Sequence, residues 1–182
     1  MANLPNYSTD RFSFGPGVLY IGAPGTTPTL DIGGVKGGAT FSVKRTKLEV
    51  KLGSPKTRVK QYTTEEEATL KVTGIEWNLA NLAYALGAGV TGVSGAEETL
   101  EFGGDMDVSN RALRFVHIAP DGSTIDLHIF KAESLGELEL AMKDDDVHEF
   151  PYEFGAVVGA TDFAGAALAD NKKLFKIIRT KV

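Results

Sequence analysis

The residues best suited to chemistry in this sequence are two histidines and one carboxylate in neighbouring extended segments. His117 belongs to the segment 113–118, whereas Asp126 and His128 belong to the segment 125–130. If these segments are the two arms of one hairpin, the imidazoles lie nearly opposite each other, and with Asp126 they make a ligand set that zinc accepts. Histidines in strands also serve as packing or surface residues. We expect this second role, because the sequence leaves the register of the hairpin open.

Other motifs match part of the residue pattern of a functional site but lack the secondary structure or further residues that such a site needs. Gly87 to Gly92 reads GAGVTG and matches the dinucleotide fingerprint, but that fingerprint needs a strand before it and a helix opening at its third glycine. Here a helix is predicted before it and none after it. The acidic segments 105–107 and 144–146 lack the glycine and the distal glutamate of a calcium loop. No serine stands in a nucleophile elbow. We therefore expect no enzyme, no cofactor and no metal.

Composition and charge narrow the class of protein further. The chain has 182 residues, 24 acidic and 19 basic side chains, a net charge of -5 and no cysteine. This length favours one domain with its own core, and the lack of cysteine excludes disulfides and thiolate chemistry. A negative net charge, with no long run of Lys and Arg residues, argues against tight binding to a phosphate backbone. We expect cytosolic folding without export signal or membrane insertion, because no segment approaches about 18 consecutive apolar residues.

Alternation of apolar and polar residues predicts a mainly β chain. Residues 1–17, rich in polar, proline and glycine residues, are expected to form an N-terminal arm, and residues 18–182 a single domain. A helix is predicted over 78–86, with Asn78 as its cap and Gly87 as its C-terminal stop. Strands are expected at 18–21, 40–52, 67–73, 99–102, 113–118, 125–130, 137–143, 147–158 and 173–181. We expect an antiparallel β-sandwich or barrel with one flanking α-helix.

The segment 40–52 changes the face on which its apolar residues lie. These residues are odd-numbered at positions 41 and 43 and even-numbered at positions 48, 50 and 52. Because successive side chains of a strand point to opposite faces, the change predicts a bulge or a change of sheet near residues 44–47. Beyond that point the polar face of this segment is expected to join the polar face of the next strand. The residues of this joint face are Lys47, Glu49, Lys51, Glu67, Thr69, Lys71 and Thr73.

Between these two strands lies a segment of fourteen residues, 53–66, without periodicity and with few apolar side chains. A hairpin usually turns in two to five residues. The excursion is therefore a functional loop, an extended flexible hairpin or a disordered segment. Its residues are Gly53, Ser54, Pro55, Lys56, Thr57, Arg58, Val59, Lys60, Gln61, Tyr62, Thr63, Thr64, Glu65 and Glu66.

Several of these segments together resemble a known family. They are the sequences GVKGG at 34–38 and FSVKR at 41–45, the residues 49–50 leading to GSP at 53–55, the helical segment IEWNLANL at 75–82, and GELEL at 136–140 followed by FPYEF at 150–154. In pattern and order they resemble the major tail-tube protein of long-tailed (siphovirus-like) bacteriophages. The resemblance covers most of the chain and includes no catalytic signature.

The resemblance implies a β-sandwich subunit that assembles into rings of six, which stack into the tube that delivers the genome into the host. The inner sheets would join into one barrel, and the loop 53–66 would contact an adjacent ring. It also implies tape-measure, terminator and tail-tip or baseplate proteins as partners, and double-stranded DNA that passes without tight binding. The subunit would belong to the virion tail and, during assembly, to the host cytoplasm. The joint polar face named above is the candidate lumen lining, although with three lysines and two glutamates it cannot alone supply an acidic wall.

Two alternatives stay open. A tube subunit of a contractile tail, a pyocin-like particle or a type VI secretion system shares the fold, and differs in its payload and in binding a sheath. From another class, the chain is a β-sandwich module that binds a ligand or carbohydrate, or a decoration protein. That module would be a discrete monomer or small oligomer with an exposed aromatic platform.

Overall fold

The computed structural model describes residues 17–104, 107–135, 140, 144 and 146–181. These residues form ten β-strands, one α-helix and one short 3₁₀ helix, η2 (Asp170–Lys172). The expected N-terminal arm, apart from Gly17, and the expected strand 137–143, apart from Leu140, lie outside the described residues. No helix within the described ranges has both the length and the apolar character that crossing a membrane requires.

One antiparallel sheet of eight strands makes up most of the fold. In spatial order its strands are β2 (Leu30–Asp31), β1 (Gly17–Gly22), β7 (Arg111–Ile118), β8 (Thr124–Ser134), β9 (Phe150–Ala156), β4 (Thr57–Gly74) and β3 (Val35–Leu52), with β10 (Phe175–Thr180) also paired to β8. A separate two-stranded sheet joins β5 (Val90–Ser94) to β6 (Glu97–Glu101).

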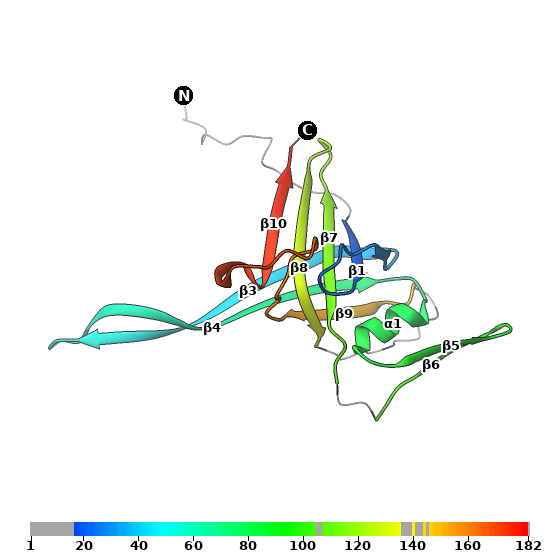
Figure 1. Ribbon diagram of the computed structural model, residues 1–182, viewed down its shortest axis with the longest axis horizontal. Helices are drawn as coiled ribbons and strands as arrows, with labels where there is room; N and C mark the ends of the chain where they lie inside the picture. Colours follow the sequence, from blue (N-terminus) through cyan, green and yellow to red (C-terminus); the bar gives the residue numbers. More distant parts are fainter. Residues whose placement is uncertain (1–16, 105–106, 136–139, 141–143, 145, 182) are drawn as a thin grey trace.

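The large sheet folds over at β8, which belongs to two layers. β10 pairs with residues 124–129 of β8, whereas β9 pairs with residues 132–134 of the same strand. In Figure 1, β1, β7, β8 and β10 stand upright, and β3, β4 and β9 run across them. The fold is therefore mainly β, antiparallel and sandwich-like with one α-helix, as the sequence predicts.

The core lies between these two layers. Leu19, Leu113 and Ile129 come from the upright layer, whereas Leu70 and Phe154 come from the crossing layer, and all are at most 1% exposed. Burying apolar side chains of this size removes their surface from water and contributes about 1.5–3 kcal/mol each. The alternation that predicts these strands is thus the pattern of a sheet with one face in the core.

Helix α1 (Leu79–Leu86) closes one end of the core and has both of its expected caps. The side chain of Asn78 accepts hydrogen bonds from the backbone N–H groups of Ala80 and Asn81, at 2.9 and 3.3 Å. Gly87 ends the helix in the left-handed conformation, at φ 71°. Asn81 is buried and donates from Nδ2 to the carbonyl of Ile32, at 2.8 Å, which ties the helix to the segment after β2.

In the β5–β6 pair, the sequence predicts only one of the two strands. A strand is expected at 99–102 after a glycine-rich loop, but the loop itself contains β5. β5 has an isolated glycine and its two valines are largely exposed, so it lacks the alternation of a half-buried strand. The fingerprint-like segment 87–92 therefore runs from the end of a helix into a strand, the reverse of the context that binds a dinucleotide.

Candidate functional site

The segment 53–66, expected as a loop, is mostly strand. β3 and β4 are 18 residues each, and only residues 53–56 turn between them, with Gly53 at φ 95°. Of the three explanations for this segment, the structure shows the extended hairpin. The interpretation of residues 57–66 as a non-periodic loop is wrong, because both faces of this part are exposed and no core enforces an alternating pattern.

The bulge expected near residues 44–47 is present, but on the neighbouring strand. Thr46 pairs with Glu65, whereas Lys47 pairs with Thr63, so Thr64 is the extra residue. A second shift between Val50 and Lys51 leaves Val59 of β4 unpaired. Bulges increase the local twist of a ladder. In Figure 1 the two strands cross and extend beyond the body as a projection, which we call the long hairpin (residues 47–63).

Each face of the long hairpin has its own chemistry. Leu48, Val50 and Leu52 lie on one face with Tyr62, which is the cross-strand partner of Leu48. Leu48 is 57% exposed, Leu52 61% and Tyr62 48%. The described chain therefore leaves an apolar strip in water on a two-stranded ladder, and a ladder of two strands is marginally stable by itself.

The opposite face of the long hairpin is charged. Glu49 accepts one hydrogen bond from Arg58, at 2.9 Å, and lies 3.2 Å from Lys51. The hydrogen bond from Arg58, and then that from Lys51, hold the pKa of Glu49 below its ordinary value. In contrast, Lys47 on this face, Lys56 in the turn and Lys60 have no carboxylate partner among the described residues. Lys60 pairs with Val50, so it lies on the apolar face, and its ammonium lies 4.7 Å from the ring centre of Tyr62.

The structure divides the seven residues expected on one lumen-facing surface between two faces. Glu67, Thr69, Lys71 and Thr73 do share the outer face of β4, since Ala68, Leu70 and Val72 point into the core. Lys47, Glu49 and Lys51 instead lie in the long hairpin, on the side of β3 that bears Phe41 and Val43. The error arises because the extra residue near Thr46 is on β4, so side chains alternate without interruption from Phe41 to Lys51 of β3.

The outer face of β4 continues onto both neighbouring strands. Lys44 of β3 lies 3.4 Å from Glu67, and Lys71 lies 2.7 Å from Glu153 of β9. We call this surface the polar face; its residues are Thr40, Ser42, Lys44, Glu67, Thr69, Lys71, Thr73 and Glu153. The two lysines among these eight residues each meet a glutamate, so these eight residues have no net charge. Lys44 and Glu153 were missed, although the inward alternation of Phe150, Tyr152 and Phe154 places Glu153 outward.

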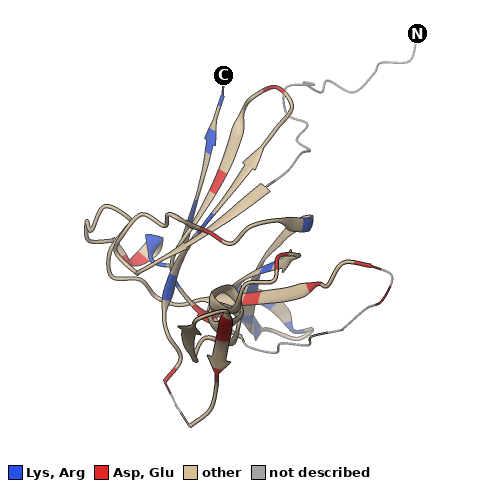
Figure 2. Cartoon of the chain, turned by 90° about the vertical axis from the view of Figure 1, so that its right-hand side faces the viewer, with Lys and Arg blue, Asp and Glu red and all other residues tan. Residues whose placement is uncertain are grey.

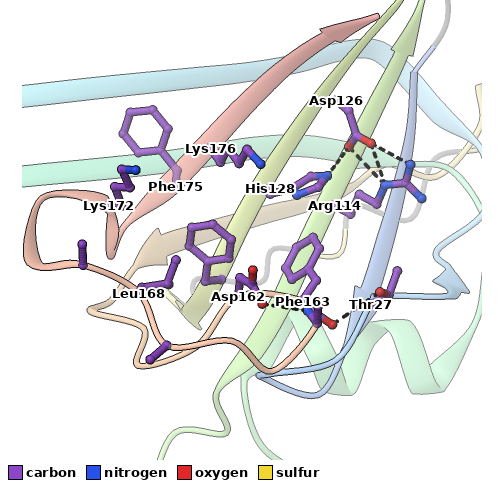
Figure 3. Close-up of a pocket in the computed structure, with 14 residues that line it drawn as sticks. Thr27, Arg114, Asp126, His128, Asp162, Phe163, Leu168, Lys172, Phe175 and Lys176 are labelled. Atoms are coloured by element: carbon purple, nitrogen blue, oxygen red, sulfur yellow. Dashed lines mark hydrogen bonds and ion pairs between the residues drawn. The ribbon is translucent and has the colours of Figure 1, made fainter.

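A cavity of about 910 Å³ lies on the upright layer, beneath the segment that joins β9 to β10. Asp126 accepts hydrogen bonds from Arg114, the shortest at 2.6 Å, and lies 3.1 Å from Nε2 of His128 (Figure 3). The imidazole of His128 stacks on Phe163, with 4.5 Å between ring centres. Burial acts to raise the pKa of Asp126, but the hydrogen bonds from Arg114, with the nearby imidazole of His128, outweigh it and hold the pKa below its ordinary value.

The zinc hypothesis for the two histidines is wrong. His128 pairs with Arg114 and His117 pairs with Ile125, which puts the imidazoles on opposite faces of the β7–β8 hairpin. The residues that the structure describes contain no group of three His, Cys, Asp or Glu side chains placed to hold a metal ion. The charge of Asp126 is balanced by its ion pair with Arg114. Among the described residues that line the cavity, Thr27 is the only one with a hydroxyl group. The network thus joins β7 to β8 and has no nucleophile beside a base.

Neither a scan against known protein-family models nor a search of curated proteins gave a match for this chain. Its function has to be inferred from the surfaces described above.

Proposed function

We propose that this protein is the subunit of a self-assembling hollow tube, built from stacked rings of six copies, as in the tails of long-tailed bacteriophages. The tube would be the conduit for genome DNA in the virion tail. The resemblance of the sequence to tail-tube proteins supports this proposal, and so do three features of the chain: the long hairpin, the free edge of β3 and the neutral polar face.

The observation on which the proposal rests is the long hairpin. It extends beyond the body and exposes Leu48, Leu52, Val59 and Tyr62. Monomeric proteins rarely keep such apolar surface in water, and where it occurs it usually marks an interface. A second copy that covers this strip would remove the apolar side chains from water and would stabilise the two-stranded ladder.

The edge of the sheet supports the same conclusion. Among the described strands, β3 pairs with β4 alone, so its other side presents unpaired backbone groups. Unprotected edges promote association, and a barrel that closes across several copies removes them. In such a barrel the polar face would line the central hole. A neutral wall suits DNA in transit, because a basic wall would bind the phosphate backbone.

Negative-stain microscopy and light scattering of the purified chain test this proposal. The matched variant replaces residues 48–62 with Asn-Gly, which joins the paired residues Lys47 and Thr63 through a two-residue turn. We expect tubes from the wild-type chain, and folded but tube-free subunits from the variant. Wild-type subunits that stay single at every concentration, even with a tail-tip complex present, would refute the proposal, as would normal tubes from the shortened variant.

The tape-measure, terminator and tail-tip proteins would then be the partners, and a contractile or secretion system stays the nearest alternative. A sheath around purified particles would favour that alternative.

The cavity beside Phe163 favours one candidate of another class, a ligand-binding module. That candidate predicts a subunit of constant size whose melting temperature rises with a bound ligand, so a ligand screen by thermal shift distinguishes it from a tube subunit.

A further inference from the structure

Two hairpins project from opposite ends of the molecule. The long hairpin reaches one end of the longest axis, and β5–β6, which we call the short hairpin (residues 90–101), reaches the other end (Figure 1). A contact between unlike ends of identical copies is heterologous, so it repeats from copy to copy and builds rings or filaments rather than closed pairs. The two projections are therefore placed as the two halves of a propagating contact.

The two hairpins have opposite charge. Residues 47–63 contain five basic side chains and one acidic side chain, whereas residues 90–101 contain three glutamates and no basic residue. Figure 2 looks at the molecule from the end where the short hairpin projects and shows its acidic residues in red. Electrostatic complementarity of this kind favours one orientation of docking and disfavours others.

On the two hairpins, lysines without a carboxylate partner and glutamates without a cationic partner among the described residues are equal in number. Lys47, Lys56 and Lys60 have no carboxylate partner among the described residues, as noted above. Within the same described ranges no cation pairs with the short hairpin's three exposed glutamates, which are Glu97, Glu98 and Glu101. The long hairpin thus has three ammonium groups without a carboxylate partner, one of them on the Tyr62 ring, and the short hairpin has three carboxylates without a cationic partner.

Apolar surface accompanies the charges on both hairpins. Val90 and Val93 of the short hairpin are 71% and 78% exposed. The short hairpin is also a separate two-stranded sheet, which by itself is marginal in water. Contact with the apolar strip of a long hairpin would cover both surfaces.

We propose that the long hairpin of one copy docks on the short hairpin of another copy, with the three unmatched lysines against Glu97, Glu98 and Glu101. This inference rests on the proposed tube function and adds to it the surface that receives the long hairpin. The contact joins the two ends of the longest axis, so each copy donates one long hairpin and receives another.

Charge reversal tests the pairing. One variant has Lys47→Glu, Lys56→Glu and Lys60→Glu, and a second has Glu97→Lys, Glu98→Lys and Glu101→Lys. We expect each alone to lose at least about tenfold in sedimentable tube, because like charges replace attractive ones. An equimolar mixture of the two, or one chain with all six changes, is expected to recover tubes. The control for net charge is Lys172→Glu, Lys176→Glu and Lys181→Glu, which we expect to assemble normally.

A second measurement needs no variant. Carbodiimide joins a lysine to a carboxylate only when the two are in contact, and in wild-type tubes we expect crosslinks between peptides containing residues 47–60 and peptides containing residues 97–101. Wild-type-like tubes from both triple variants, or no recovery in the mixture, would overturn the pairing and leave the tube function standing. A wild-type chain that forms no tubes would overturn the function and this inference together.

Discussion

The Lys71 ammonium lies 2.7 Å from Oε2 of Glu153, and this ion pair links β4 to β9 on the polar face. Lys44 and Glu67 make the equivalent contact between β3 and β4, at 3.4 Å. The four side chains are between 38% and 76% exposed, so each pair contributes at most about 1 kcal/mol to folding. Their main consequence is electrostatic, because each lysine that would face the lumen has its charge balanced by a neighbour.

The first prediction concerns that balance. Glu67→Gln with Glu153→Gln leaves Lys44 and Lys71 without carboxylate partners, and tubes of this variant are expected to retain double-stranded DNA. The retention should fall steeply between 50 and 200 mM salt, because binding releases counterions from the phosphates. Filter retention of labelled DNA measures it. Tubes of the opposite variant, Lys44→Gln with Lys71→Gln, should retain no DNA. Equal retention of DNA by the two variants would contradict a polar face that lines the lumen.

How much of this fold the sequence predicts depends on burial. The helix at 78–86 and the strands around Leu113, Ile129 and Phe154 are predicted correctly, because each has one face in the core and so a clear period. The long hairpin has no buried face, and β5 exposes its valines, so neither shows the alternation that marks a strand. If another copy covers these residues, as proposed, their exposure in one copy explains why a single sequence gives only a weak signal for them.

The strand register is the second feature of the fold that this sequence does not predict. The parity change in β3 predicts a bulge in β3 itself, but the extra residue, Thr64, lies on β4, so the apolar residues of β3 do change face. Side chains expected on the polar face therefore lie on the other side of the ladder. The same limit applies to Asp126, whose contacts with Arg114 and His128 depend on a register that the turn geometry sets.

The second prediction separates backbone strain from crowding at two left-handed glycines. Gly87 has φ 71° and Gly95 has φ 64°, so alanine at either position adopts an unfavourable conformation that costs about 1–2 kcal/mol. A Cβ at Gly87 would also lie 2.8 Å from Cγ1 of Val108, whereas a Cβ at Gly95 meets nothing within 4 Å. Gly87→Ala should therefore lower the free energy of unfolding more than Gly95→Ala, as measured by urea titration. Equal losses would contradict the packing at the helix end.

The third prediction concerns Asp126. Asp126→Asn keeps the shape of the side chain but removes the charge that Arg114 and His128 share, and it should lower the free energy of unfolding by about 1–3 kcal/mol at pH 7. The pKa of Asp126 is lowered in the folded chain. Its stabilisation is therefore present above the unfolded pKa of about 3.9 and is lost as the pH falls through the lower folded pKa.

Urea titrations of the wild type and of Asp126→Asn across that pH range measure this effect. The difference between the two chains should be constant at neutral pH and should shrink in strong acid. Asp170→Asn is the control, because among the residues that the structure describes Asp170 pairs with Lys173 alone, at an exposed site where its side chain is 98% accessible. A difference for Asp126→Asn that does not change with pH would contradict a charged network at this cavity.

The last prediction concerns Tyr152, which is 2% exposed in the core beside Gly74. Burial, with a smaller contribution from the charge of Glu76, raises the pKa of Tyr152 to about 12. Because the folded pKa is above the unfolded value of about 10, the stabilisation from the neutral phenol is complete below pH 10 and is lost as the pH rises towards 12. Absorbance at an ultraviolet wavelength specific to tyrosinate should show one of the five tyrosines titrating last. Tyr152→Phe should remove that late step and flatten the loss of stability at high pH, whereas Tyr62→Phe, at an exposed site, should change neither.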